Sequence, residues 1–197
     1  MLEGKETMLF SLKLGGIAMF YSIYDSSPVG RLTMASDGEN IVGLWIEGQK
    51  YFLNTLSEQP VECNDFPVFQ KANEWLDRYF AGEKPKITEL PLAPTGGEFR
   101  QGVWEILCKI PYGEVMTYGK IAKIMAARMG RDKMSAQAVG GAVGHNPISI
   151  IIPCHRVVGS NGNLTGYAGG IKLKVKLLEL EGTDMSKLFV PTKGTAL

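Results

Sequence analysis

Three side chains that can take part in nucleophilic chemistry are adjacent in the second half of the chain. Cys154, His155 and Arg156 follow Pro153 at the end of the apolar run 148–152. A thiolate is a strong nucleophile, and a nearby cation such as Arg156 or a protonated His155 favours the thiolate over the thiol. Free cysteines are also among the most buried residues of proteins, so a structural role for Cys154 stays open at this point.

The apolar run 148–152 predicts a buried strand, which ends at Pro153 because proline has no N–H to donate to a sheet. Cys154 is then expected at the mouth of a core element, rigidly held and partly exposed. Neighbouring residues of a regular strand point to opposite faces, so Cys154 and His155 cannot pair directly on a strand. Either the backbone turns at this point or a bridging water relays the proton.

The stretch Pro153-Cys154-His155-Arg156-Val157 resembles the active-site motif of the O6-alkylguanine-DNA alkyltransferases, the suicidal DNA-repair methyltransferases. Residues 95–182 are closely similar to the catalytic domain of that family, and residues 19–90 resemble its more variable N-terminal domain. The resemblance implies irreversible transfer of the alkyl group of O6-alkylguanine in DNA to Cys154, once per protein and without a cofactor. O4-alkylthymine stays open as a second substrate. The flanking matches are Gly140-Gly141, Asn146-Pro147, Gly166-Tyr167-Ala168-Gly169-Gly170 and Leu178-Glu179-Leu180-Glu181-Gly182.

The resemblance also assigns catalytic roles to residues around Cys154. The glutamate matching Glu181 orients the histidine matching His155, which activates the cysteine through a water. The tyrosine matching Tyr118 protonates or polarises the departing purine, and the asparagine matching Asn146 holds the active-site turn. Without the family, a core aromatic and a turn-starting asparagine explain Tyr118 and Asn146 equally well.

Further positions match the family's pocket for the flipped base. Tyr167 and Ala168 match a loop that packs on the base and contacts O6 through backbone N–H groups. Gly169 leaves room for the alkyl substituent. The carbonyl oxygens of Cys154 and Val157 match the acceptors for the exocyclic amine of the base.

The cysteines and histidines predict neither a disulfide framework nor a metal site. Cys63, Cys108 and Cys154 are an odd and sparse set, which suits a reducing cytoplasm. His145 and His155 are the only histidines, and no two cysteines have the spacing of a zinc site. No apolar stretch reaches the roughly 18 residues that a membrane span needs, so no membrane association is expected.

Short β-rich runs and one helical pattern predict the secondary structure of the first part of the chain. Three runs separated by turn residues predict an antiparallel meander, and apolar residues at three- and four-residue spacing predict a helix packed on it. The proline-rich stretch 85–94 is expected to be an extended linker. The strands are expected at 20–24, 30–36 and 41–46, and the helix at 66–80.

Helical patterns dominate the second part, so the expected fold class is α/β in the α+β sense: a small N-terminal antiparallel sheet with a helix, and a mainly helical C-terminal domain. Two short helices, N-capped by Thr117 and Ser135 and joined by a basic turn, suggest a helix-turn-helix. The last helix ends at Glu181, where the macrodipole disfavours a carboxylate, so Glu181 is expected to have a specific partner. The four lysine and glutamate positions within that helix are expected to face solvent. The helices are expected at 99–109, 118–127, 135–144 and 171–181.

Several residues of the helix-turn-helix are candidates for contact with DNA. Arg128, Arg131 and Lys133 lie in the basic turn and predict phosphate contacts with little sequence preference. Gln137 stands where the family commonly has an arginine that enters the base stack, so extrusion of the base is expected to be weaker or more salt-tolerant here. The second helix has few side chains for reading base edges, and the family implies docking in the minor groove. The remaining candidates are Ser135, Ala138 and Gly141.

The two halves of the chain differ in charge. Residues 1–92 hold 8 Lys/Arg against 13 Asp/Glu, a net charge of −5, whereas residues 93–197 hold 13 against 7, a net charge of +6. A basic half that carries the motif fits a polyanionic partner, which is expected to be double-stranded DNA with alkylated bases, bound by a monomer. The expected domains are an extension (1–18), whose order the sequence leaves open, a domain that is ribonuclease-H-like by resemblance (19–92), a catalytic and DNA-binding domain (93–182) and a loose tail (183–197).

Two other functions remain as alternatives. One is a non-catalytic binder of alkylated DNA or a helix-turn-helix regulator, and the presence of Cys154 in the motif argues against it. The other is a Cys–His hydrolase, which would turn over and form an acyl intermediate. The adjacency of Cys154 and His155 disfavours that alternative, because the two side chains cannot pair on a regular strand.

Overall fold

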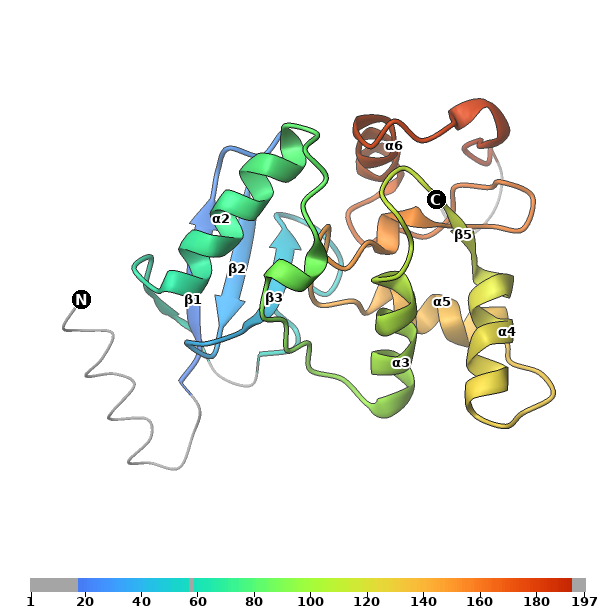
Figure 1. Cartoon of the computed structure of the whole chain (residues 1–197), viewed down its shortest axis with the longest axis horizontal. Helices are drawn as coiled ribbons and strands as arrows, with labels where there is room; N and C mark the ends of the chain where they lie inside the picture. The colour runs from blue at the N-terminus through green and yellow to red at the C-terminus, as the bar shows by residue number, and fades with distance from the viewer. Residues whose placement is uncertain (1–17, 57–58, 193–197) are drawn as a thin grey trace.

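A small mixed sheet with one helix across it forms the first part of the structure. The computed structural model describes residues 18–56 and 59–192 of the chain. Three strands form the predicted antiparallel meander, and a short fourth strand adds to it in parallel, in the order β3-β2-β1-β4. Figure 1 shows the helix α2 lying across this sheet. The bounds are β1 Phe20–Tyr24, β2 Leu32–Ser36, β3 Ile41–Ile46, β4 Val61–Glu62 and α2 Pro67–Phe80.

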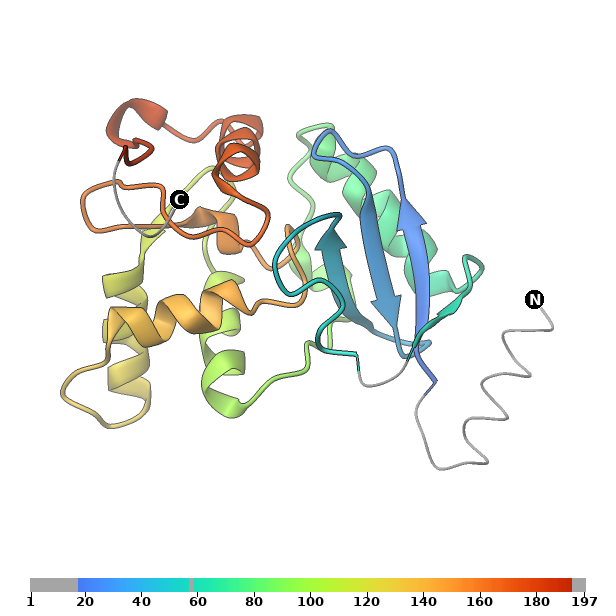
Figure 2. The same cartoon turned by 180° about the vertical axis from the view of Figure 1, so that it is seen from behind.

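Helices form most of the second part, as the sequence predicts. They surround a two-stranded parallel pairing of β5 and β6, and Figure 2 shows them from behind. The fold class expected from the sequence, α+β with a sheet followed by helices, is confirmed. The bounds are α3 Glu98–Leu107, β5 Met116–Thr117, α4 Tyr118–Arg128, α5 Ala136–Gly144, β6 Val157–Val158 and α6 Ile171–Leu180, with short 3-10 helices η1 Ile87–Glu89, η2 Cys154–Arg156 and η3 Met185–Lys187.

The two helices of the predicted helix-turn-helix begin at the predicted caps. The side chain of Thr117 accepts a hydrogen bond from the backbone N–H of Lys120, and that of Ser135 accepts from Gln137 and Ala138. Each cap satisfies N–H groups that have no partner within the first turn of a helix. Both helix starts are therefore fixed by local sequence.

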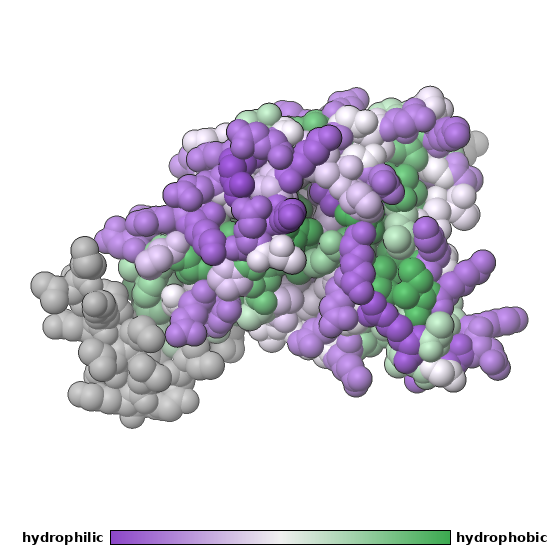
Figure 3. Space-filling model, in the orientation of Figure 1, coloured by the Kyte–Doolittle hydropathy of each residue, from purple (hydrophilic) through white to green (hydrophobic). Residues whose placement is uncertain are grey.

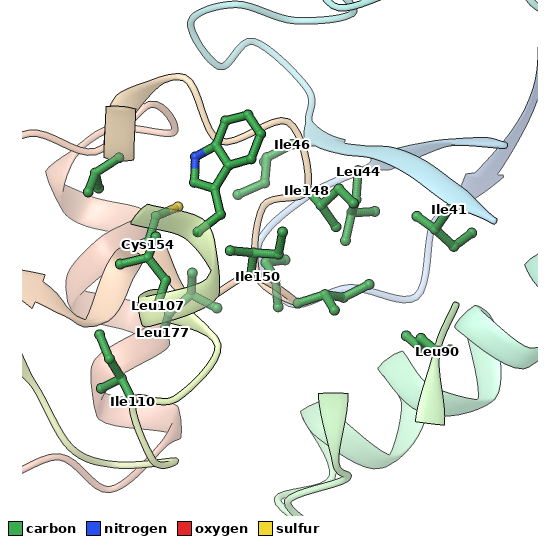
Figure 4. Packing of buried hydrophobic residues seen from close by; sticks show 14 of the residues in the cluster. Ile41, Leu44, Ile46, Leu90, Leu107, Ile110, Ile148, Ile150, Cys154 and Leu177 are labelled. Atoms are coloured by element: carbon green, nitrogen blue, oxygen red, sulfur yellow. The ribbon is translucent and has the colours of Figure 1, made fainter. Parts of the chain in front are cut away.

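The predicted buried strand 148–152 is wrong, although its burial is right. Only Ile148 forms a bridge, a parallel one to Leu44 of β3, and the backbone then turns through Ile150 with φ 69°. The reason is Asn146, whose side chain hydrogen-bonds the backbone of Ile148 and Ile152 and so replaces a ladder with a turn. Figure 4 shows Ile148 and Ile150 packed between β3 and the segment that carries Cys154.

One hydrophobic core runs through both parts of the chain. Phe20 and Leu76 of the first part belong to the same buried cluster as Trp104, Ile152 and Leu177 of the second. The sheet and the helices are therefore packed together, and the segment before Cys154 lies within this shared core (Figure 4). None of the helices in the described ranges is long and apolar enough to cross a membrane.

Two further expectations from the sequence need correction. Lys174, expected on the solvent face of α6, is fully buried. Residues 183–192 are not a loose tail, because Leu188 packs on the small cluster around Val158 and Leu164, and Leu164 donates its N–H to the carbonyl oxygen of Phe189. Residues 1–17 of the predicted extension and 193–197 of the predicted tail lie outside the described residues.

Candidate active site

Cys154 begins the 3-10 turn η2 and is almost enclosed. Only 4% of its surface is exposed, so the expected partial exposure of the thiol is wrong. The side-chain nitrogen of Asn146 lies 3.2 Å from Sγ of Cys154 and 2.8 Å from the carbonyl oxygen of Ile152. Burial raises the pKa of the Cys154 thiol, and the hydrogen bond from Asn146 acts in the opposite direction. The same asparagine therefore shapes the turn and contacts the sulfur.

The turn brings His155 against a carboxylate. Nε2 of the fully buried His155 lies 2.8 Å from Oε1 of Glu181. A carboxylate can only accept, so Nε2 carries the proton and Nδ1 is left as an acceptor. Nδ1 has no hydrogen-bond partner among the described residues. Burial lowers the pKa of His155, so the ring is neutral at physiological pH and Nδ1 can accept a proton.

Glu181 is surrounded by donors. Besides His155, the guanidinium of Arg156 binds both of its oxygens, at 2.8 Å and 2.9 Å. The hydroxyl of Tyr79 donates to Oε1 at 2.7 Å, and the N–H of Gly113 donates to Oε2 at 3.2 Å. Burial alone would raise the pKa of Glu181, but the hydrogen bonds and charges of His155 and Arg156 outweigh it and lower the pKa. Glu181 is therefore charged at neutral pH and hydrogen-bonded at both oxygens, with the specific partners that its position at a helix end predicted.

Arg156 does not have the role that the sequence suggested for it. Its guanidinium faces Glu181 and the carbonyl oxygen of Ile110, 2.6 Å away, instead of the thiol. The positive charge of Arg156 is thus compensated by Glu181.

Two tyrosines flank the thiol. The hydroxyl of Tyr118, at the start of α4, lies 3.3 Å from the carbonyl oxygens of Thr165 and Gly166. Burial and then the charge of Cys154 raise the pKa of Tyr118 to about 12, so the phenol keeps its proton at neutral pH. Tyr167 meets the His155 ring edge to face at 6.5 Å, and its hydroxyl has no partner among the described residues.

A pocket of ≈ 830 Å³ opens beside these tyrosines. Tyr118, Gln137, Gly141, Tyr167 and Ala168 line it, so the structure gathers five of the residues that the sequence singled out. Its lining also includes Gly140 and Gly166 of the flanking matches, and Lys50 and Tyr51 of the first part, which the sequence did not single out. A pocket of this size can take a single nucleobase.

Other candidates lie away from this pocket. Arg128 is ion-paired with Glu105 of α3, with its Nη1 3.2 Å from Oε2, whereas Arg131 and Lys133 are exposed in the turn between α4 and α5. Ser135 uses its hydroxyl as the cap of α5, and Ala138 is exposed on that helix. Figure 3 shows hydrophilic side chains projecting from the end of the molecule that carries α3 and α4.

Gly169 and Val157 each have a specific contact. A Cβ atom on Gly169 would come within 2.9 Å of the Tyr167 ring and 3.3 Å of Ile46, so glycine is required for the loop to pack on β3. The carbonyl oxygen of Val157 accepts a hydrogen bond from Lys174 at 2.6 Å. Neither Tyr79 nor Lys174 was predicted as part of a site, because periodicity alone placed Tyr79 on an apolar helix face and Lys174 in solvent.

Two family models match the chain almost end to end over its described part. The 6-O-methylguanine DNA methyltransferase ribonuclease-like domain matches residues 19–94, and the DNA binding domain of the same methyltransferase matches residues 98–183. The chain belongs to the 6-O-methylguanine DNA methyltransferase family. The resemblance that rests on the motif around Cys154 is thereby confirmed.

Individual members of the 6-O-methylguanine DNA methyltransferase family agree in length as well as in sequence. The methylated-DNA–protein-cysteine methyltransferase of Haemophilus influenzae is 45% identical over 164 residues, which are 83% of this chain and 87% of that protein. That of Methanosarcina acetivorans is 45% identical over 166 residues, 84% of this chain and 99% of the relative. Mycobacterium tuberculosis OGT, solved in complex with DNA, has a TM-score of 0.68 at 42% identity, covering 82% of this chain and 92% of that one.

Proposed function

We propose that this protein repairs DNA by transferring the alkyl group of O6-alkylguanine irreversibly to Cys154, once per molecule. The observation that carries the proposal is the Cys154–His155–Glu181 arrangement beside a pocket lined by Tyr118 and Tyr167. The relatives named methylated-DNA–protein-cysteine methyltransferase support the reaction, and the DNA complex of the M. tuberculosis relative supports DNA as the partner.

Proton transfer is the first step of the proposed reaction. His155 is neutral and presents Nδ1 as a free acceptor, which takes the thiol proton of Cys154 through a bridging water. Glu181 fixes the ring and its tautomer through Nε2, in the manner of a nucleophile, base and orienting acid. No direct hydrogen bond between Cys154 and His155 is needed, which answers the geometric objection raised by their adjacency.

Displacement at carbon is the second step. The thiolate of Cys154 attacks the alkyl carbon, a carbon–sulfur bond forms as the carbon–O6 bond breaks, and the electron pair passes to the purine. Tyr118 retains its proton at neutral pH and is the donor available to the departing purine. The product is a thioether, which water does not hydrolyse under these conditions, so the protein acts once and no cofactor is required.

The partner and the remaining roles follow from the same proposal. Asn146 holds the turn, Val157 accepts from the exocyclic amine, and Tyr167, Ala168 and Gly169 enclose the base. The end of α4, the turn after it and helix α5 meet double-stranded DNA that contains alkylated bases, through the residues Arg128, Arg131, Lys133, Ser135, Gln137, Ala138 and Gly141. We further propose a division into domains 19–92 and 93–182 and action as a monomer in the cytoplasm, where a reducing environment preserves the free thiol of Cys154.

Intact mass spectrometry after incubation with a methylated oligonucleotide tests the function. We expect the mass of one methyl group to be added per protein molecule, located on Cys154 by peptide mapping. Cys154→Ser abolishes the transfer and keeps DNA binding, whereas the matched variants Cys63→Ser and Cys108→Ser react normally. Methyl groups on Cys63 or Cys108, or several turnovers per protein, would refute the proposal.

A further inference from the structure

Lys174 is buried in α6, the helix that packs on the turn η2 with Cys154. It has no exposed surface, and its ammonium lies 2.6 Å from the carbonyl oxygen of Val157 and 2.8 Å from that of Thr165. No carboxylate forms an ion pair with Lys174 within the described residues. An ammonium that is removed from water without a counter-charge is expensive for a fold, so its retention indicates a specific use.

The two carbonyl oxygens that Lys174 binds belong to two different segments of the site, and Thr165 lines the pocket. Val157 directly follows the turn that carries Cys154, whereas Thr165 lies in the loop that leads to Tyr167. The carbonyl oxygen of Thr165 is also within 3.3 Å of the hydroxyl of Tyr118. Lys174 therefore ties the segment of the nucleophile to the loop and, through one shared carbonyl oxygen, to the phenol.

The charge of Lys174 also acts on the sulfur. Burial raises the pKa of Cys154, while the hydrogen bond from Asn146 and then the positive charge of Lys174 lower it. Burial lowers the pKa of Lys174 to about 8. The negative charge of Cys154 acts in the opposite direction and favours the ammonium form of Lys174. Burial lowers the pKa of His155 as well, and although Glu181 raises it, the charges of Arg156 and Lys174 lower it further.

Other titratable groups around the sulfur do not supply this charge. Tyr118 and Tyr167 are acids whose pKa values are raised, first by burial and then by the charge of Cys154, so they stay neutral. Arg156 is paired with Glu181. Among the described residues this leaves Lys174 as the cation whose charge lowers the pKa of Cys154 and which has no carboxylate of its own.

We propose that Lys174 is a positioning residue of the alkyl transfer: its buried ammonium is the counter-charge of the Cys154 thiolate, and it fixes the Val157 and Thr165 carbonyl groups of the site that takes the base. The role in positioning the base rests on the proposed function, whereas the role in thiol ionisation does not.

The pH dependence of thiol labelling tests the first role without any DNA. In Lys174→Met, which keeps an unbranched side chain and removes the charge, the midpoint of iodoacetamide labelling of Cys154 moves to higher pH. Labelling at pH 7.5 slows roughly tenfold, as expected for a nearby charge in a partly screened site. Peptide mass spectrometry separates Cys154 from Cys63 and Cys108, whose labelling stays the same. The matched control is Lys172→Met, an exposed lysine of the same helix.

A second measurement does not depend on whether Lys174→Met folds. In full-length protein with carbon-13-labelled lysine, the lysine resonance that titrates well below the exposed ones reports Lys174. Its midpoint falls in Cys154→Ser, because the thiolate that favours the ammonium is gone. An unchanged midpoint in Cys154→Ser, or unchanged Cys154 labelling in a folded Lys174→Met, overturns the proposal. Failure of the proposed function would give a different result. The wild-type protein would then transfer no methyl group, while the pH midpoint of Cys154 labelling would still change in Lys174→Met.

Discussion

At the scale of single residues, the chemistry depends on the carboxylate of Glu181, whose two oxygens both accept hydrogen bonds. Glu181 accepts from His155, Arg156, Tyr79 and the backbone of Gly113, and its side chain is completely enclosed. Hydrogen bonds to a buried charge are stronger than neutral ones, and each lost donor or charge leaves its partners unsatisfied. Glu181 therefore sets both the orientation of the His155 ring and the balance of charge around it.

Replacing Glu181 by glutamine removes that charge with little change in shape. We expect the rate of alkyl transfer from a methylated oligonucleotide to fall by about one to two decades, since a charge-assisted hydrogen bond of roughly 1.5–3 kcal/mol is lost. The midpoint of Cys154 labelling should rise. Stability should also fall by roughly 3–5 kcal/mol, because Arg156 becomes a buried, unpaired cation. Single-turnover kinetics and urea unfolding measure the two effects.

The pH dependence of the stability lost in Glu181→Gln follows from the direction in which the pKa of Glu181 is shifted. The pKa of Glu181 is lower in the folded than in the unfolded protein. Its contribution to stability is therefore complete above the unfolded pKa of about 4.3 and disappears as the pH falls through the folded pKa. The stability difference between wild type and Glu181→Gln should shrink below about pH 4. Glu179→Gln, on the exposed face of α6, is the control, and equal effects of the two variants would refute a special role for Glu181.

Which residues could be found from the sequence depended on how local their signals are. Thr117 and Ser135 were identified as caps because a cap is defined by its own next three residues. Tyr79 and Lys174 were missed because their partners, Glu181 and the carbonyl oxygens of Val157 and Thr165, lie far away in the sequence or belong to the backbone. No periodicity in a single sequence carries such information.

At the scale of elements, one side chain decides whether the segment before Cys154 is a strand or a turn. The run 148–152 has the composition of a buried strand, and its burial was predicted correctly. Asn146 provides donors and an acceptor to the backbone of Ile148 and Ile152, so the chain turns instead of pairing. The turn continues into η2, which lets Cys154 and His155 serve the same site although they are neighbours. Asparagine before proline is a turn signal, but its competition with a β-rich run could not be decided from the sequence.

The element expected to meet DNA is α5, and it offers a direct test. Gln137 is exposed near the start of this helix and lines the pocket. In Gln137→Arg we expect faster alkyl transfer from duplex DNA and a steeper dependence of binding on salt, because a guanidinium adds both charge and stacking to the site that the extruded base leaves. Repair rates and binding at several salt concentrations measure the two effects.

A matched variant separates the two properties of the arginine. Gln137→Lys adds a charge without a planar group, so it should steepen the salt dependence and raise the rate less than arginine does. If neither variant changes the rate or the salt dependence, Gln137 is not the residue that takes the place of the extruded base.

At the scale of the whole molecule, the first part of the chain reaches into the site of the second. The core is continuous between them, the backbone N–H of Lys50 donates to the carbonyl oxygen of Ala168, and Tyr51 stacks on His145 with ring centres 4.1 Å apart. The hydroxyl of Tyr79 on α2 reaches Glu181 at 2.7 Å. The first part of the chain thus contributes a donor to the carboxylate that orients His155.

This connection predicts that Tyr79→Phe weakens both stability and chemistry. The variant removes one donor from a buried carboxylate, so urea unfolding should show a loss of about 1.5–3 kcal/mol, together with a several-fold slower methyl transfer. Tyr112→Phe is the matched control, since its half-buried hydroxyl donates at 3.3 Å to a neutral acceptor, the carbonyl oxygen of Leu180. It should lose only about 0.5–1.5 kcal/mol and keep the wild-type rate. Equal effects on the rate in the two variants would mean that the first part of the chain supports the fold but not the reaction.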